Sequence, residues 1–149
     1  MVIDCHVHIC AFTPQHGKTS AHLLSTIPFR FMRWRLGLRG QDDQTERDLE
    51  RTLLSAIAGT TQIDAVALLA FDAVYTKLGA LDLTNTHLYV TNDYTIDLCQ
   101  RFPTKLLFGA SVHPYRLDAS AELERCIKAG AVLLKWLPIV QDFNPADPR

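Results

Sequence analysis

The sequence predicts an α/β fold built on a parallel sheet, and three observations support this prediction. Short apolar runs alternate along the chain with segments whose apolar residues recur at helical spacing. Strands that follow one another through helices pair in parallel through right-handed crossovers. The chain of 149 residues is 48% hydrophobic and 21% charged, as expected of an ordered globular domain. We therefore expect residues 1–149 to form a single domain.

Four apolar runs are expected to form strands: residues 2–9, 63–71, 106–113 and 131–137. Residues 63–71, IDAVALLAF, are short and nearly all apolar, as is typical of a strand covered on both faces. Three intervening segments are expected to form helices: residues 42–59, 91–102 and 119–128. The first carries Leu49, Leu53 and Ile57 at four-residue spacing and ends at Gly59, while Thr91 or Asn92 caps the second.

The order of these elements suits either an open doubly wound sheet or a closed barrel. A glycine-rich phosphate loop after the first strand would favour the open sheet, and the sequence has none there. We therefore predict a parallel (β/α)8 barrel of the TIM-barrel type. Because a complete barrel usually needs about 250 residues and eight strands, only its first four β/α units are expected in this chain.

Residues 10–41 form an unusually long connection between the first strand and the first helix. They contain five bases and no acid; the bases are Lys18, Arg30, Arg33, Arg35 and Arg39. We expect a short helix over the barrel mouth, with its arginines facing water or the acids that follow. As a hypothesis, this segment is a lid in which Arg33 and Arg35 bind an anionic substrate. The net charge of −1 argues against nucleic acid or a membrane as partner.

The remaining global features favour a cytoplasmic protein. The four cysteines show no CxxC spacing, so a reducing compartment is preferred to a disulfide framework or a zinc ribbon. There is no basic region followed by an apolar run at the amino terminus, as a secretory signal would require. No apolar stretch approaches the roughly 18 residues that would span a bilayer.

The stretch VIDCHVHI, residues 2–9, places two histidines one residue apart in an expected strand. Side chains alternate across a strand, so His6 and His8 share one face with Asp4, and Cys5 points to the other. Two positions along a strand span about 6.6 Å, from which two imidazoles can converge on a cation about 2.0–2.1 Å from each nitrogen. The pair predicts a divalent metal site; the alternative is two polar residues tolerated at a strand end.

Three stretches, DCHVHI, ASVHPYR and LLKWLPIVQDFNPADP, resemble the amidohydrolase superfamily. The resemblance is to its branch of predicted metal-dependent hydrolases of the TIM-barrel fold, related to the aminocarboxymuconate-semialdehyde decarboxylase group, and covers only the amino-terminal half of that domain. It implies that His6 and His8 are the first two ligands of a metal, zinc before manganese or iron, which activates water for hydrolysis. The family's further ligands, two histidines and an aspartate, come from later strands.

Lys135 is a third candidate at the metal site. It alternates with Leu134 and Trp136, so we expect it to point into the barrel, where an unpaired ammonium is costly. The resemblance implies the fourth-strand lysine that becomes carbamylated and bridges two metal ions. The alternatives are an unmodified lysine that binds an anionic substrate, or an ion pair with Asp142 or Asp4.

Two further candidates lie at the end of the third expected strand and in the loop after it. His113 precedes Pro114, which holds it extended, and we expect it at the mouth of the site as a catalytic or substrate-contacting residue. The alternative is a histidine bonded to a backbone carbonyl. Arg116, in the same loop, either binds a substrate carboxylate or lies in solvent.

These residues predict a metal-dependent hydrolase that acts on an amide, ester or lactone of a small molecule. Non-oxidative decarboxylation is the neighbouring chemistry, and the sequence does not separate the two. The alternative of another class is a non-catalytic half-barrel, because four parallel strands leave two open edges. Burying these edges would need a homo-oligomer or a separate carboxyl-terminal half. We expect the chain by itself to be inactive as a hydrolase.

Overall fold

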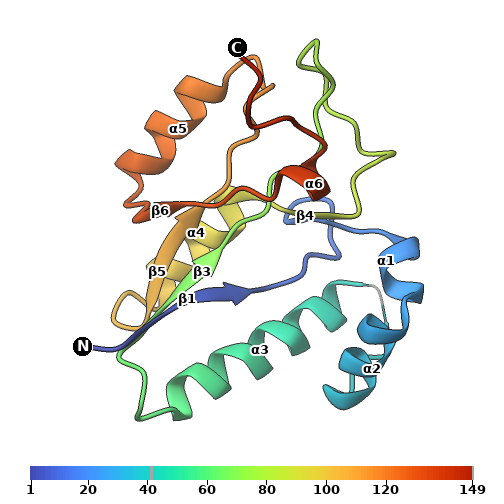
Figure 1. Cartoon of the computed structure of the whole chain (residues 1–149). Helices are drawn as coiled ribbons and strands as arrows, with labels where there is room; N and C mark the ends of the chain where they lie inside the picture. Colours follow the sequence, from blue (N-terminus) through green and yellow to red (C-terminus); the bar gives the residue numbers. More distant parts are fainter. Residues whose placement is uncertain (41, 149) are drawn as a thin grey trace.

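A computed structural model describes residues 1–40 and 42–148 and confirms the α/β class. Gln41, the last residue of the predicted long connection, and Arg149 lie outside the described residues. One parallel sheet has four strands in chain order (Figure 1): β1 (Ile3–His8), β3 (Ala65–Leu69), β5 (Leu106–Ala110) and β6 (Leu133–Leu134). Each lies within a predicted strand, although each is shorter than predicted.

Three helices follow the first three strands of this sheet: α3 (Asp43–Gly59), α4 (Asn92–Arg101) and α5 (Ala119–Lys128). Their bounds agree with the predicted ones to within one residue. Thr91 caps α4, because its side chain accepts a hydrogen bond from the Tyr94 N–H at 3.2 Å. The core lies between these helices and one face of the sheet, and alternate β3-segment residues Val66, Leu68 and Ala70 belong to it.

The prediction of a (β/α)8 barrel of the TIM-barrel type is wrong for this chain. The parallel sheet is open, with β1 and β6 at its edges, and within the described residues no further strand pairs with either of them. Continuous apolar runs specify strands buried between layers, but open sheets and barrels both use such strands. Closure depends on strand number, tilt and register, which local patterns do not encode.

The long connection has structure of its own. It contains β2 (Gly17–Thr19), α1 (Ala21–Ser25) and α2 (Ile27–Arg35), and Figure 1 shows both helices beside the start of α3. β2 pairs antiparallel with β4 (Leu88–Val90), a pairing that sequence analysis missed. A short helix, α6 (Pro138–Gln141), follows β6. None of the helices in the described ranges is long and apolar enough to cross a membrane.

Gly17 is required where β2 meets β4, and we predict that Gly17→Ala is strongly destabilising. Its φ is +144°, and a Cβ there would lie 2.0 Å from the backbone oxygen of Tyr89. Because backbone cannot move aside cheaply, we expect a loss of more than about 2 kcal/mol in the free energy of unfolding. Gly59→Ala is the control: a Cβ at Gly59 has no neighbour within 4 Å, so helix propensity predicts a gain of up to about 1 kcal/mol. Urea unfolding of both variants tests the contrast, and equal stabilities would contradict it.

Candidate metal centre

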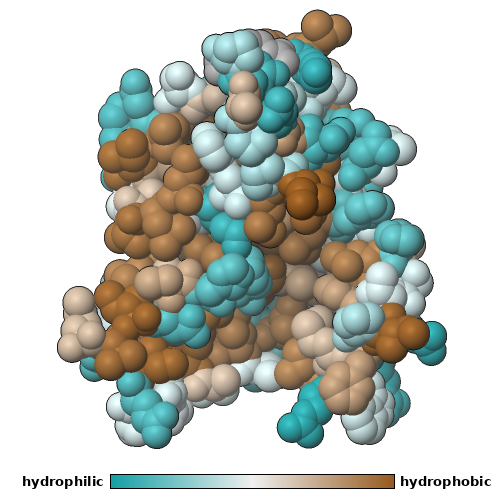
Figure 2. All heavy atoms as spheres, in the orientation of Figure 1, coloured by the Kyte–Doolittle hydropathy of each residue, from teal (hydrophilic) through white to brown (hydrophobic). Residues whose placement is uncertain are grey.

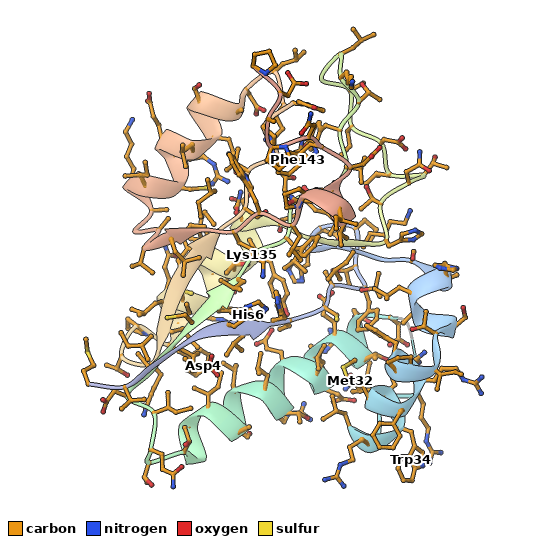
Figure 3. The ribbon with its side chains drawn as sticks, in the orientation of Figure 1. Asp4, His6, Met32, Trp34, Lys135 and Phe143 are labelled. Atoms are coloured by element: carbon orange, nitrogen blue, oxygen red, sulfur yellow. The ribbon has the colours of Figure 1, made fainter. Side chains whose placement is uncertain are left out.

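The face of the sheet away from the core carries a row of residues from all four strands. His8 pairs with Leu69, Leu69 with Gly109, and Gly109 with Leu133. Paired residues of neighbouring strands point to the same face, so His8 lies on the face opposite the core residues. Lys135 follows Leu133 by two positions and therefore shares this face, as the sequence predicted; Figure 3 shows Lys135 and His6 on the same side of the sheet. In Figure 2 a polar strip in the middle of the view lies between apolar patches.

An irregularity in β1 changes which side chains reach this face. The register between β1 and β3 shifts between Asp4 and Val7, which is the signature of a bulge. The His6 N–H donates to Asp4 Oδ1 at 2.9 Å within this segment. Asp4 pairs with the core-facing Val66, so the prediction that Asp4 shares the face of the two histidines is wrong. The alternation of side chains along a regular strand does not predict a bulge, which places an extra residue in one strand.

The two predicted histidines converge. Their Nε2 atoms lie 2.9 Å apart, and their rings meet edge to face with centroids separated by 4.7 Å. The Lys135 Nζ lies 3.4 Å from His6 Nε2. Three nitrogen atoms from β1 and the segment after β6 are thus brought together, although 129 positions separate His6 from Lys135 in the chain. Within the described residues, neither Asp142 nor Asp4 forms an ion pair with Lys135.

The electrostatics of this cluster favour uncharged nitrogen atoms. Burial lowers the pKa of His8 to about 4, and the neighbouring Lys135 and His6 act in the same direction. Burial also lowers the pKa of Lys135. In the contact between the two rings, one Nε2–H donates to the other Nε2, and the tautomers decide which ring is the donor. A neutral imidazole is also the form that binds a metal ion, so the environment of His8 suits a ligand.

The donor set fits a divalent ion held by two imidazoles. If an ion lay about 2.0–2.1 Å from both Nε2 atoms, their 2.9 Å separation would give an angle of about 90° between the two nitrogen–metal bonds. Six-coordinate ions accept this angle. Within the part of the chain that the structure describes, no cluster of three histidine, cysteine or carboxylate side chains could hold a metal. Two protein ligands are fewer than the three usual for catalytic zinc. The site therefore suits weak binding with open coordination positions.

His113 lies elsewhere, in a buried network that ties α6 to the sheet. Its ring is fully buried; Nε2–H donates to the Gln141 carbonyl at 2.7 Å, and Nδ1 accepts the Tyr115 N–H at 3.1 Å. The His113 N–H donates to Asp72 Oδ2 at 2.7 Å. Both ring nitrogens are thus bonded to backbone groups, which is the alternative that the sequence left open. No contact described in the structure joins His113 to Lys135 or the paired histidines.

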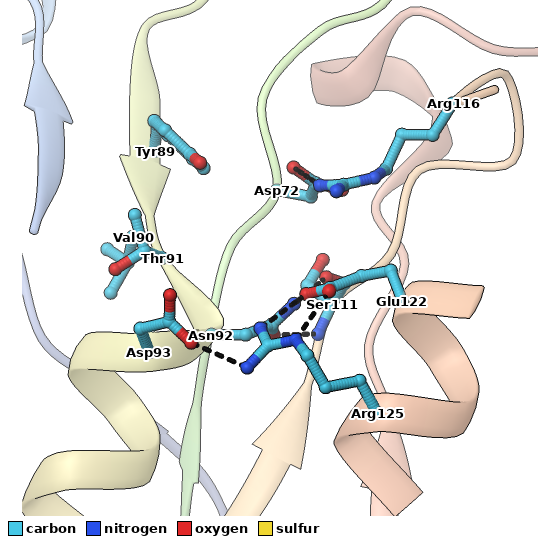
Figure 4. A pocket seen from close by; sticks show the side chains of 10 residues that line it. All are labelled: Asp72, Tyr89, Val90, Thr91, Asn92, Asp93, Ser111, Arg116, Glu122 and Arg125. Atoms are coloured by element: carbon cyan, nitrogen blue, oxygen red, sulfur yellow. Dashed lines mark hydrogen bonds and ion pairs between the residues drawn. The ribbon is translucent and has the colours of Figure 1, made fainter. Parts of the chain in front are cut away.

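Arg116 belongs to a second, polar pocket of about 320 Å³ near the end of β3 and the starts of α4 and α5 (Figure 4). Its guanidinium lies 3.3 Å from Asp72 Oδ2 and 2.9 Å from Asp118 Oδ1. Across the pocket, Arg125 pairs with Glu122 at 2.7 Å. Both arginines therefore already have carboxylate partners. Burial raises the pKa of Asp72 in spite of the nearby guanidinium.

The two arginines of the predicted lid lie on α2. Arg33 donates from Nη2 to the Gly40 carbonyl at 2.9 Å, and Arg35 is exposed. No hydrogen bond or ion pair described here links either side chain to the histidine pair. Their role in binding an anionic substrate stays a prediction.

Sequence analysis missed several buried polar residues. Glu46 is 4% exposed and accepts hydrogen bonds from the backbone of Phe12 and Thr13 at 2.6 and 3.0 Å. Gln141 and Asp72 complete the network around His113. The position of Asp72 in the sequence could have indicated its role, because Asp72 directly follows an apolar run at the carboxyl end of a parallel strand. Glu46 lies among other acids in a helical first turn, which gave no sign of burial.

Comparison with known proteins adds no relative: no family model, no curated protein and no solved structure matches this chain. The functional reading therefore depends on the geometry of the site.

Proposed function

We propose that the His6, His8 and Lys135 cluster binds a divalent metal ion, zinc, manganese or iron, as part of a metal-dependent hydrolase of small amides, esters or lactones. The observation that supports this most directly is the convergence of the two Nε2 atoms at 2.9 Å. Such an ion, when bound, polarises a carbonyl group and lowers the pKa of a coordinated water molecule.

The chain's own residues have separable tasks in this proposal. His8 offers a nitrogen lone pair near neutral pH, because burial keeps its imidazole unprotonated. The His6 Nε2 lies beside it, 2.9 Å from the His8 Nε2. Lys135 Nζ lies near the same His6 atom, and a ligand that takes the Nε2 lone pair would free this amine. With its lowered pKa, Lys135 is then suited to accept a proton or to bind an anionic oxygen of the substrate.

Zinc titration of metal-free protein tests the binding part. We expect binding of one ion per chain, weakened by at least about tenfold in His6→Ala and in His8→Ala, because each variant removes one of the two imidazole ligands. The matched control is His22→Ala with His87→Ala, which removes two exposed imidazoles from another part of the surface. Equal zinc affinity in the wild type and in His6→Ala would overturn the proposal.

Turnover of an ester, a lactone and an amide tests the hydrolytic part, measured against the same concentration of free zinc. Turnover by the zinc-loaded protein that His6→Ala removes would support hydrolysis. Because only two imidazoles hold the ion in the described residues, we expect zinc binding with little turnover from this chain by itself. Hydrolysis would then require further ligands at the same ion.

A further inference from the structure

Helix α2 presents an apolar stripe to solvent. Ile27, Phe31 and Trp34 recur at helical spacing and are 82%, 61% and 74% exposed. The Phe31 and Trp34 rings contact each other with centroids 5.8 Å apart. Figure 3 shows Trp34 at the outer edge of the molecule and Met32 on the side toward α3. No residue of α2 is buried, so this helix displays its largest apolar side chains instead of packing them.

Arginines surround this stripe. At about 100° of rotation per residue, Arg30 and Arg35 lie on either side of the line through the three apolar side chains. Arg30, Arg33 and Arg39 line a hollow of about 390 Å³ beside Trp34. We call the three apolar residues together with Arg30, Arg33, Arg35 and Arg39 the α2 surface.

The charge of the α2 surface is not neutralised by the described part of the protein. No ion pair there includes any of its four arginines, and Arg33 Nε is buried without a hydrogen-bond partner. The acids that follow are bonded elsewhere: Asp42 to Thr45, Asp43 to Arg47, Glu46 to Thr13, Asp48 to Arg51 and Glu50 to Arg101. Of the two predicted orientations of the arginines, toward water or toward these acids, the second is therefore not seen in the described structure.

The chain as a whole is electrically polarised. Residues 10–41 carry five bases and no acid, so the rest of the chain carries a formal charge of −6, since the total is −1. An anionic surface therefore attracts this segment more strongly than it attracts the rest of the chain. The net charge of −1 for the whole chain does not reveal this uneven distribution of charge along the sequence.

We propose that the α2 surface docks the protein onto a bilayer that contains anionic phospholipid. The stripe enters the interfacial region, where tryptophan and phenylalanine side chains are favoured, and the flanking arginines bind lipid phosphates. This inference is independent of the metal site.

Vesicle co-sedimentation of the full chain tests the charge requirement. We expect binding to phosphatidylcholine vesicles that contain phosphatidylserine, little binding to pure phosphatidylcholine, and release at high salt. Arg30→Gln with Arg35→Gln should weaken binding by about thirtyfold. The matched control, Arg51→Gln with Lys128→Gln, removes two exposed charges on other helices and should change binding less than about threefold.

The apolar requirement is tested in the same assay. Phe31→Ser with Trp34→Ser should lose most of the binding, whereas Leu78→Ser with Leu117→Ser, at positions 88% and 87% exposed, should keep it. Tryptophan emission should shift to the blue on addition of anionic vesicles in the wild type and not in Trp34→Phe. Equal binding to neutral vesicles, or binding to single-stranded RNA without vesicle binding, would overturn the proposal. So would a dimer that dissociates in Phe31→Ser with Trp34→Ser while vesicles are not bound.

Discussion

Replacing His113 by alanine should destabilise the protein by roughly 3–5 kcal/mol. The side chain is fully buried and its ring packs against the rings of Tyr75, Tyr115 and Phe143, with centroids 5.2–5.3 Å away. The substitution leaves a cavity among these rings. It also leaves the Gln141 carbonyl and the Tyr115 N–H without their partner, and each unsatisfied buried group adds to the cost.

Urea unfolding measures this loss, with His22→Ala as the control. His22 is exposed on α1, so its substitution should change stability by no more than about 0.5 kcal/mol. Tryptophan fluorescence adds a local readout, because the Trp136 ring lies against Phe143 of the same cluster. A His113→Ala protein as stable as the wild type would contradict the structural role and return His113 to the catalytic candidates.

The same residue gives the protein an acid-sensitive contribution to stability. Burial lowers the pKa of His113 from its ordinary 6.5, and the positive charge of Arg116 also lowers it. The negative charges of Asp72 and Asp142 raise this pKa, but they do not cancel the effect of burial. As the pH falls below about 6.5, the unfolded chain takes up this proton before the native chain does, so stability falls. Above that pH the contribution is complete. Between about pH 7 and pH 5 the wild type should therefore lose more stability than His113→Ala, and equal losses would contradict this assignment.

The helices and the parallel strands were predictable because their signals are local. Leu49, Leu53 and Ile57 repeat with the helical period, and α3 begins and ends within one residue of the prediction. The segment IDAVALLAF contains β3 because its apolar run is too short for a helix and too continuous for an exposed strand. β2 and β4, of three residues each, were missed, because pairing between distant short segments leaves no periodic signal.

The site was predictable only in part. Alternation along each strand predicted that His6 and His8 share a face and that Lys135 points to the same side of the sheet, and the contacts at 2.9 and 3.4 Å agree with this. The bulge that excludes Asp4 depends on how β1 fits β3, which is a tertiary property. His113 was placed at the end of the right strand, but β5 ends at Ala110, three positions before His113. Its partner Gln141 lies 28 positions away, at the end of α6, a helix that is not among the predicted elements.

Glu46→Ala should release the segment that follows β1 and destabilise the protein by roughly 2–4 kcal/mol. The Glu46 carboxylate accepts hydrogen bonds from the Phe12 N–H, the Thr13 N–H and the Thr13 hydroxyl at 2.6–3.0 Å, and it also pairs with His16 Nδ1. The His16 ring stacks on Tyr94, with centroids 3.9 Å apart. One buried side chain thus holds residues 12–16 against α3 and α4.

In Glu46→Ala, residues 12–16 should detach before the whole protein unfolds, because the polar contacts of Glu46 lie outside the core between the sheet and the helices. Limited trypsin digestion should cut Glu46→Ala faster than the wild type within residues 10–41, where all five bases are free of ion pairs in the described structure. Glu124→Ala is the control, because Glu124 is 71% exposed and lies 4.0 Å from its lysine partner. Equal digestion of Glu46→Ala and Glu124→Ala would contradict the anchoring role.

Zinc affinity provides the link between this anchor and the metal centre. Phe12 follows His8 by only four positions, so freeing residues 12–16 removes a constraint on the end of β1 where His8 projects. We expect Glu46→Ala to weaken zinc binding by a few-fold while Glu124→Ala leaves it unchanged, because a looser ligand must be ordered again when the ion binds. His16→Ala, which removes one of the four bonds to Glu46, should lie between the wild type and Glu46→Ala in both protease sensitivity and zinc affinity. If the two properties change independently across this series, residues 12–16 do not help to hold His8 in place.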